Sequence, residues 1–94
     1  MFARVSAYRP APNSIGEPTE ETVRRVLNLD GCLGIYYLVG AKNRTLSITL
    51  WDSAETIAAS RVEADAIRAE TSADQQLEIL DVEEFEVVTR QLRD

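Results

Sequence analysis

The stretch from Asn43 to Ile57, in which a strand runs directly into a helix, constrains the fold more than any other part of the chain. Apolar and polar residues alternate from Thr45 to Leu50, which is the period-two pattern of a strand with one apolar and one polar face. Trp51, the only tryptophan, closes this strand. Asp52 then stands at an N-cap position with Glu55 three residues later, so the sequence predicts a capping box at the start of the helix.

Hydrophobic periodicity divides the rest of the chain into further strands and helices. Pro18 suits the first turn of a helix, with Glu17 or Thr19 as its cap, and Asp30-Gly31 ends that helix. We expect strands near residues 2–9, 32–39, 44–51 and 79–89, helices near 18–29 and 53–70, and a polar loop over 71–76.

The second and third strands are expected to form a hairpin through a loop over residues 40–43. This loop length sets the register of the two strands. The predicted partners are Val39 with Arg44, Tyr37 with Leu46, Ile35 with Ile48 and Leu33 with Leu50 on one face, and Leu38 with Thr45, Tyr36 with Ser47, Gly34 with Thr49 and Cys32 with Trp51 on the other.

The resulting order, β-α-β-β-α-β, predicts an α+β fold of the ferredoxin-like type, a four-stranded antiparallel sheet with two helices on one face. A doubly wound parallel sheet is excluded because the hairpin connection is too short for a crossover. The 94 residues form one domain, residues 1–94. A domain of this size buries only about 60–65% of its unfolded-chain surface, so we expect it to gain burial by pairing as a homodimer.

Composition excludes several classes of partner. The net charge is −6 and the basic residues are scattered, which argues against nucleic acid and anionic membranes as partners. With 45% hydrophobic residues the chain is typical of a globular protein, and no stretch approaches the ~20 apolar residues of a membrane span. The single cysteine and the absence of a signal-peptide pattern predict a cytoplasmic protein. The preference for arginine over lysine indicates a GC-rich bacterial genome.

The chain contains no histidine, and this removes most catalytic chemistry that operates near neutral pH. Ser-His-Asp and Cys-His catalysis and histidine-based zinc or iron sites are excluded. No glycine-rich phosphate loop indicates a nucleotide or flavin. We therefore expect neither a metal nor a cofactor.

The segment from Gly31 to Val39, followed by Leu46 to Glu55 and an alanine-rich helix, resembles the antibiotic biosynthesis monooxygenase-like superfamily of dimeric α/β barrels. The resemblance in element order covers nearly the whole chain. It implies that two subunits pair their sheets face to face into a barrel, with a pocket between the helices and the sheet of each subunit. Members include cofactor-free monooxygenases of polyketide quinone pathways, haem-degrading enzymes and small proteins without an assigned role.

The resemblance also implies candidate site residues. The haem-degrading branch uses an axial histidine, which this chain lacks. In the monooxygenase branch a tryptophan, tyrosines, an asparagine and an arginine surround a phenolic substrate whose anion activates oxygen. Trp51 matches the tryptophan by its position in the junction and is the candidate catalytic residue. The candidate substrate-binding residues are Tyr8, Tyr36, Asn43 and Arg44.

Structural interpretations compete with these roles. A single large aromatic such as Trp51 is more often a packing anchor than a catalytic group, and tyrosines on the same face can equally fill a dimer interface. The spacing of Asp52 and Glu55 is that of a capping box rather than of an acid–base pair. Cys32 without a basic neighbour is expected to be a small buried hydrophobe.

Two functional hypotheses follow from the sequence. The first is a small cofactor-free monooxygenase that oxidises an aromatic or polyketide-like substrate with molecular oxygen. The alternative is a non-catalytic homodimer that binds a small hydrophobic or aromatic molecule or supports a stress or metabolic pathway. In both, the dimer is expected to form through the sheet face that bears Phe2, Tyr8, Tyr36, Leu38, Trp51 and Val88.

Overall fold

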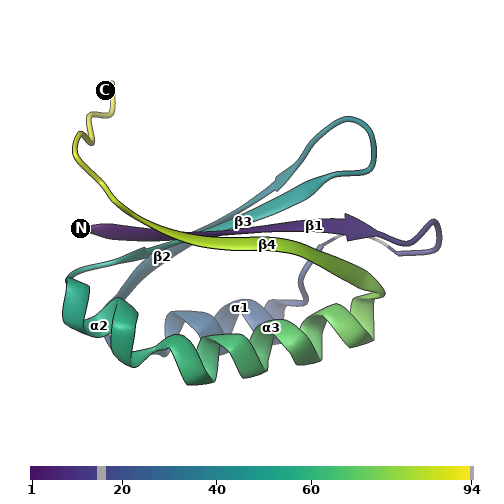
Figure 1. Ribbon diagram of the computed structural model, residues 1–94, viewed down its shortest axis with the longest axis horizontal. Coiled ribbons are helices and arrows are strands. Elements are labelled where there is room, and N and C mark those ends of the chain that lie inside the picture. Colours follow the sequence, from purple (N-terminus) through teal and green to yellow (C-terminus); the bar gives the residue numbers. More distant parts are fainter. Residues whose placement is uncertain (15–16, 94) are drawn as a thin grey trace.

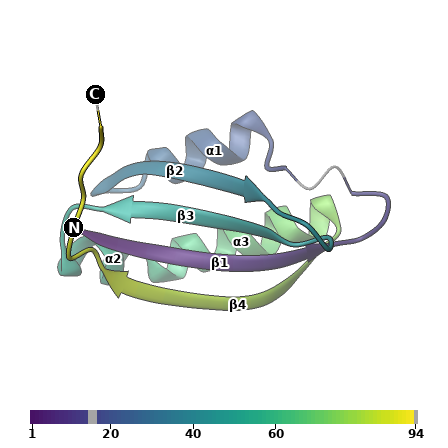
Figure 2. The same cartoon turned by 90° about the horizontal axis from the view of Figure 1, so that it is seen from above.

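The computed structural model describes residues 1–14 and 17–93 and shows a sheet of strands covered on one side by helices (Figure 1). The strands pair in the order β2-β3-β1-β4, and every pair is antiparallel (Figure 2). The elements are β1 (Phe2–Pro10), α1 (Glu20–Leu27), β2 (Cys32–Val39), β3 (Thr45–Trp51), α2 (Ala54–Ala59), α3 (Arg61–Gln75) and β4 (Leu77–Glu86). This α+β arrangement is compatible with the predicted ferredoxin-like fold. No helix within the described residues is long and apolar enough to cross a membrane.

The helix predicted over residues 53–70 is two helices, α2 and α3, which meet at Ser60. The carbonyl of Ile57 accepts hydrogen bonds from the side chains of Ser60 (2.8 Å) and Arg4 (2.9 Å). Side chains that bind a helix carbonyl compete with the backbone ladder and break or bend the helix at that turn. The loop predicted over 71–76 was wrong, because α3 continues to Gln75 and ends at Gln76 in the left-handed conformation.

The predicted junction between strand and helix is present, but its cap lies one residue later than predicted. The N-cap is Ser53 instead of Asp52, and its capping-box partner is Thr56 instead of Glu55. Ser53 Oγ accepts from the Thr56 backbone N–H at 3.2 Å, and Thr56 Oγ1 accepts from the Ser53 N–H at 3.3 Å. The hydroxyl of Thr56 also donates to Asp52 at 2.7 Å, which makes Asp52 a supporting residue of the cap.

Gly31 permits this junction to pack against the turn before β2. Its φ of 81° lies in the left-handed region, which glycine adopts without steric cost. A Cβ at this position would lie 2.4 Å from Thr56 Cβ, so no other residue fits without moving the cap. The carbonyl of Gly31 accepts from the Asp52 N–H at 2.9 Å, which joins the two segments.

The register of the hairpin between β2 and β3 corrects the prediction. Tyr37 lies opposite Ser47 rather than Leu46, and Tyr36 lies opposite Ile48. An irregularity between Cys32 and Gly34 inserts one residue into β2, so the predicted pair of Cys32 with Trp51 is present while every later pair is shifted. Because of the one-residue shift, Tyr36 shares its face with Leu46 and Ile48, and Tyr37 shares its face with Thr45 and Ser47, the reverse of the predicted grouping.

The helices α1, α2 and α3 all lie on the same side of the sheet (Figure 1). The face that they cover is the more polar one. On this face β1 and β3 place Arg4, Ser6, Tyr8, Thr45, Ser47, Thr49 and Trp51. The covered face therefore includes Tyr8 and Trp51, and the prediction that both lie on an exposed dimer face is wrong. Hydrogen bonds to the helices and within the sheet allow the polar groups of this face to be buried.

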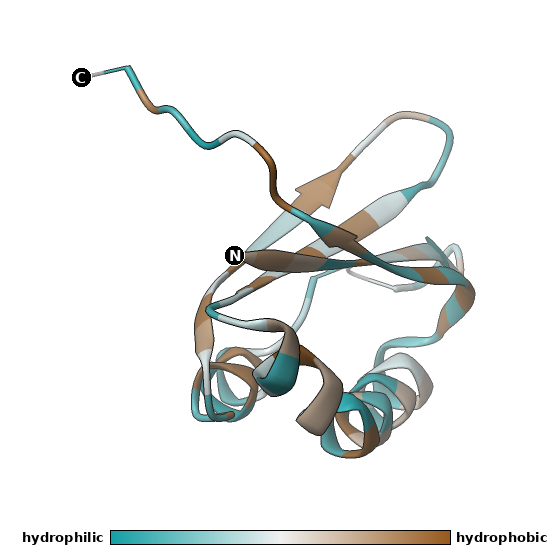
Figure 3. Cartoon of the chain, turned by 60° about the vertical axis from the view of Figure 1, so that its left-hand side comes forward, coloured by the Kyte–Doolittle hydropathy of each residue, from teal (hydrophilic) through white to brown (hydrophobic). Residues whose placement is uncertain are grey.

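The opposite face is not covered by helices and is mainly apolar, with Asp81 and Glu83 of β4 at its edge, and we call it the open face. Its strands contribute Ala3, Val5, Ala7, Tyr36, Leu38, Leu46, Ile48, Leu50 and Phe85. Tyr36 is 56% exposed, Leu38 44% and Phe85 47%. The segment after β4 leaves the body on this same side of the sheet, with Val88 exposed (Figure 3). Tyr36 and Leu38 thus lie on the exposed face, as predicted.

Candidate functional site

A cavity of about 60 Å³ lies between the covered face of the sheet and the helices. Its walls come from all four strands and from α1 and α3, and include Tyr8, Tyr37, Trp51, Val26, Ala64 and Ile67. The small side chains of Ser6, Ser47 and Thr49 face the alanine-rich helix across this layer, and their size leaves the space unfilled.

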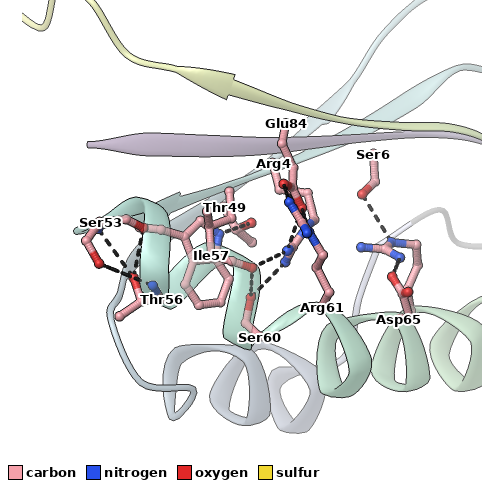
Figure 4. Close-up of polar contacts among 12 residues, drawn as sticks. Arg4, Ser6, Thr49, Ser53, Thr56, Ile57, Ser60, Arg61, Asp65 and Glu84 are labelled. Atoms are coloured by element: carbon pink, nitrogen blue, oxygen red, sulfur yellow. Dashed lines mark hydrogen bonds and ion pairs between the residues drawn. The ribbon is translucent and has the colours of Figure 1, made fainter.

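Arg4, at one side of the cavity, is buried, with only 3% of its surface exposed. Its Nη2 donates to the carbonyl of Ile57 and to Glu84, both at 2.9 Å, and its Nη1 donates to Ser60 Oγ at 3.2 Å (Figure 4). The guanidinium carbon also lies 5.3 Å from the ring centroid of Trp51, within the range of a cation–π contact. Arg4 therefore joins β1 to α2, β4 and Trp51.

Glu84 is held between two arginines. Arg4 approaches it from β1, and Arg61 Nη2 approaches it from α3 at 2.7 Å (Figure 4). Hydrogen bonds from Arg61 and Arg4 outweigh the cost of burial and lower the pKa of Glu84 from 4.5 to about 2. The carboxylate is therefore ionised throughout the physiological range and balances the buried charge of Arg4.

Trp51 is fully buried and has its only polar group satisfied. Its Nε1 donates to Thr49 Oγ1 at 2.9 Å, while its ring forms part of the cavity wall. The indole N–H is thus engaged within the protein, and it is the ring of Trp51 that borders the cavity. Its burial is consistent with the packing anchor, and its place in the cavity wall is consistent with the candidate catalytic role.

Two tyrosines stand side by side in the cavity wall. The rings of Tyr8 and Tyr37 stack with centroids 6.3 Å apart. Tyr8 shares a 3.1 Å hydrogen bond with Ser47, and the Tyr37 hydroxyl donates to Thr45 Oγ1 at 3.1 Å. Burial raises the pKa of Tyr37 above 10, so this phenol stays neutral at physiological pH.

The structure brings together only two of the five residues that the sequence indicated as site residues. Trp51 and Tyr8 line the cavity, whereas Tyr36 projects from the open face. Asn43 and Arg44 are exposed near the end of the hairpin, where the Asn43 side chain donates to the carbonyl of Pro10. These three residues do not contribute to the cavity.

Arg4, Tyr37 and Arg68 line the cavity but were not predicted as site residues. The alternation of β1 already places Arg4 on the same face as Tyr8, so Arg4 was accessible to sequence reasoning. Tyr37 was missed because the one-residue shift in β2 was not predicted. Gly34 was the signal for it, since a glycine inside a strand often marks a bulge. Arg68 was missed because it was assigned to the solvent-exposed polar face of its helix, whereas its side chain is only 10% exposed.

The described residues offer no other obvious reactive group. Among residues 1–14 and 17–93, no three acidic or cysteine side chains gather where they could hold a metal ion. Cys32 is half-buried, and burial raises the pKa of its thiol above 9, which makes it a poor nucleophile at neutral pH.

No protein-family model and no curated protein sequence matches this chain. Any function must therefore be argued from the site itself. Its aromatic walls, small volume and two buried guanidinium groups are suited to binding a small, mainly apolar molecule.

The lowered pKa of Glu84 predicts a specific dependence of stability on acid. Its charged form stabilises the fold fully above the unfolded-state pKa near 4.5, and this contribution is lost as pH falls through the folded-state pKa of about 2. We expect Glu84→Gln to lower the thermal midpoint at pH 7 and to flatten its decline between these two values, as measured by circular dichroism.

Glu83→Gln is the matched control for this experiment. The neighbouring Glu83 lies on the other face of β4, and a hydrogen bond with Asp81 raises its pKa. A carboxyl with a raised folded-state pKa opposes the acid-side loss of stability, so its removal should retain this decline or make it steeper. Identical pH profiles for wild-type protein and Glu84→Gln would contradict the role assigned to the Glu84 carboxylate.

Proposed function

We propose that this protein is a homodimer, of the dimeric α/β-barrel type, that binds a small and mainly apolar molecule in the cavity of each subunit. The observation that supports the binding function is the convergence of Trp51, Tyr8 and Tyr37 on one cavity. Aromatic walls with a few polar groups are typical of small-molecule sites. The free thiol of Cys32 is in keeping with a reducing, cytoplasmic compartment.

The open face supports the dimer. Apolar side chains from all four strands lie there, with Tyr36 and Phe85 about half exposed and the carboxylates of Asp81 and Glu83 confined to the edge strand β4. Monomeric proteins rarely expose contiguous apolar patches larger than a few hundred Å², and sheets bury such faces by packing about 10 Å apart. A second copy of the same face has matching shape and chemistry and would cover it by a two-fold operation.

The dimer predicts that a charge on the open face separates the subunits. Tyr36→Glu should convert a dimer at ~10 µM into a folded monomer in light scattering, because a buried unpaired carboxylate disfavours the interface. Val62→Glu places the same charge on α3, where Val62 is 81% exposed, and should leave the dimer intact. A wild-type protein that is monomeric at that concentration would contradict the proposal.

Cofactor-free oxidation of a phenolic substrate is the second candidate function. It is supported by the placement of a tryptophan and two tyrosines beside Arg68, whose weakly compensated charge would favour a substrate anion. Arg68 takes the role that was predicted for Arg44. A tricyclic anthrone is much larger than a cavity of about 60 Å³, so this activity also requires the helices to move away from the sheet.

Filling the cavity tests the binding function. Trp51 is the only tryptophan, so its fluorescence should change saturably when 1-butanol or phenol enters the cavity. Ala64→Leu adds three carbons to the cavity wall and should weaken this binding about tenfold or more, because the added side chain occupies the ligand volume. The exposed Ala69→Leu on the same helix is the control and should bind as the wild type does.

The same proteins separate the two candidate functions. The cofactor-free monooxygenase would be supported by oxygen uptake with a hydroxyanthrone above the spontaneous rate, provided that Ala64→Leu reduces this uptake and Ala69→Leu does not. Saturable binding without oxygen uptake would support the binding protein. If Ala64→Leu binds both probes as tightly as the wild type, the cavity is not the binding site.

A further inference from the structure

One region of the cavity wall has polar groups that the protein leaves without partners. Ser72, on α3, lines the cavity and is only 5% exposed, yet its Oγ makes no hydrogen bond with any described residue. Beside it, Thr71 shares a 3.2 Å hydrogen bond with Thr22 of α1. An unpaired buried hydroxyl costs roughly 1–3 kcal/mol, so a ligand atom that bonds to Ser72 would recover that cost.

Arg68 lies one helical turn before Ser72, and residues four apart on a helix are neighbours on the same face. Its Nε donates to Ser6 Oγ at 3.2 Å and its Nη1 to Asp65 at 2.6 Å, while its Nη2 has no hydrogen-bond acceptor among the described residues. The Arg68 side chain is 10% exposed, but that of Asp65 is 66% exposed. A carboxylate so well solvated compensates a buried cation weakly.

Arg4, the other buried arginine, differs from Arg68 in this respect. Each of its three guanidinium nitrogens donates a hydrogen bond, and its carboxylate partner Glu84 is fixed by a second arginine. The guanidinium of Arg4 therefore binds other parts of the protein with all three of its nitrogens. Arg68 retains a donor and a weakly compensated positive charge at the cavity wall, which are the properties of an anion-binding group.

The dimensions of the cavity limit the size of the anion. A water needs at least ~10–15 Å³ in this measure, so a cavity of about 60 Å³ has room for roughly four waters or a ligand of similar size. Beyond Arg68 and Ser72, the walls are formed by apolar and aromatic side chains such as Ile67, Val26 and Trp51. A short hydrocarbon chain with one anionic end matches this distribution.

We propose that the cavity binds a short-chain aliphatic monocarboxylate, with its carboxylate on Arg68 and Ser72 and its hydrocarbon chain against Trp51. This inference rests on the proposed binding function and specifies the chemical class of the ligand. The carboxylate accepts from Arg68 Nη2 and from the hydroxyl of Ser72, so both unused donors obtain an acceptor.

The experiment compares propionate and butyrate with 1-propanol and 1-butanol at pH 7, using Trp51 fluorescence of the full chain. We expect the carboxylates to bind more tightly than the alcohols. Arg68→Gln should weaken butyrate binding about tenfold or more, since hydrogen bonds to charged groups are the strong ones, and should leave 1-butanol binding within about twofold. Ser72→Ala should weaken butyrate binding by a smaller factor.

Two further variants keep the test decisive. Arg68→Lys retains the charge and should recover part of the butyrate affinity, which a purely structural role would not produce. Arg25→Gln removes an exposed arginine of α1 that pairs with Glu70 and should not alter binding. If 1-butanol binds and butyrate does not, the carboxylate assignment fails while the binding function stands; if neither binds, both fail.

Discussion

The buried guanidinium of Arg4 is the group on which the packing of sheet and helices depends. It donates to the carbonyl of Ile57 near the end of α2, pairs with Glu84 on β4 and lies over one face of the Trp51 ring. Glu84 extends the same network to Arg61 on α3. Removing one partner of a buried ion pair costs about 3–5 kcal/mol because the other charge is left uncompensated. The layer between sheet and helices is therefore held by directed polar contacts as well as by apolar burial.

This polar layer explains both the cavity and the open face. Small hydroxyl side chains such as Ser6, Ser47 and Thr49 satisfy arginine, tyrosine and tryptophan donors but fill little volume. Space consequently remains between the sheet and the alanine-rich α3. The aliphatic residues of the same strands point the other way, to a face that no helix covers (Figure 2). In the proposed dimer the second subunit supplies the apolar burial that a polar inner layer lacks.

The positions of the strands and the antiparallel topology could be predicted from the sequence, because alternation and turn residues are local signals. The face alternation of β1, with Arg4 and Tyr8 together, was also correct. The face that the helices cover was predicted wrongly, because the aromatic residues were assigned to a dimer interface. The helices instead cover the face that carries Arg4, whose acceptors lie on α2, far away in sequence. The break between α2 and α3 at Ser60 also depends on side chains that bind the Ile57 carbonyl. The capping box begins at Ser53, one residue later than predicted. The irregularity near Gly34 shifted the register and moved Tyr37, instead of Tyr36, to the cavity.

Both proposed functions require that the space between the sheet and the helices is open to a small apolar molecule. Crystals exposed to xenon under pressure test this directly, because xenon enters apolar cavities that are accessible from solvent. We predict a xenon atom within the cavity, in contact with Trp51, Ile67 and Tyr8. A xenon-treated crystal with no xenon between the sheet and α3, and with the side chains closed around that space, would contradict the account.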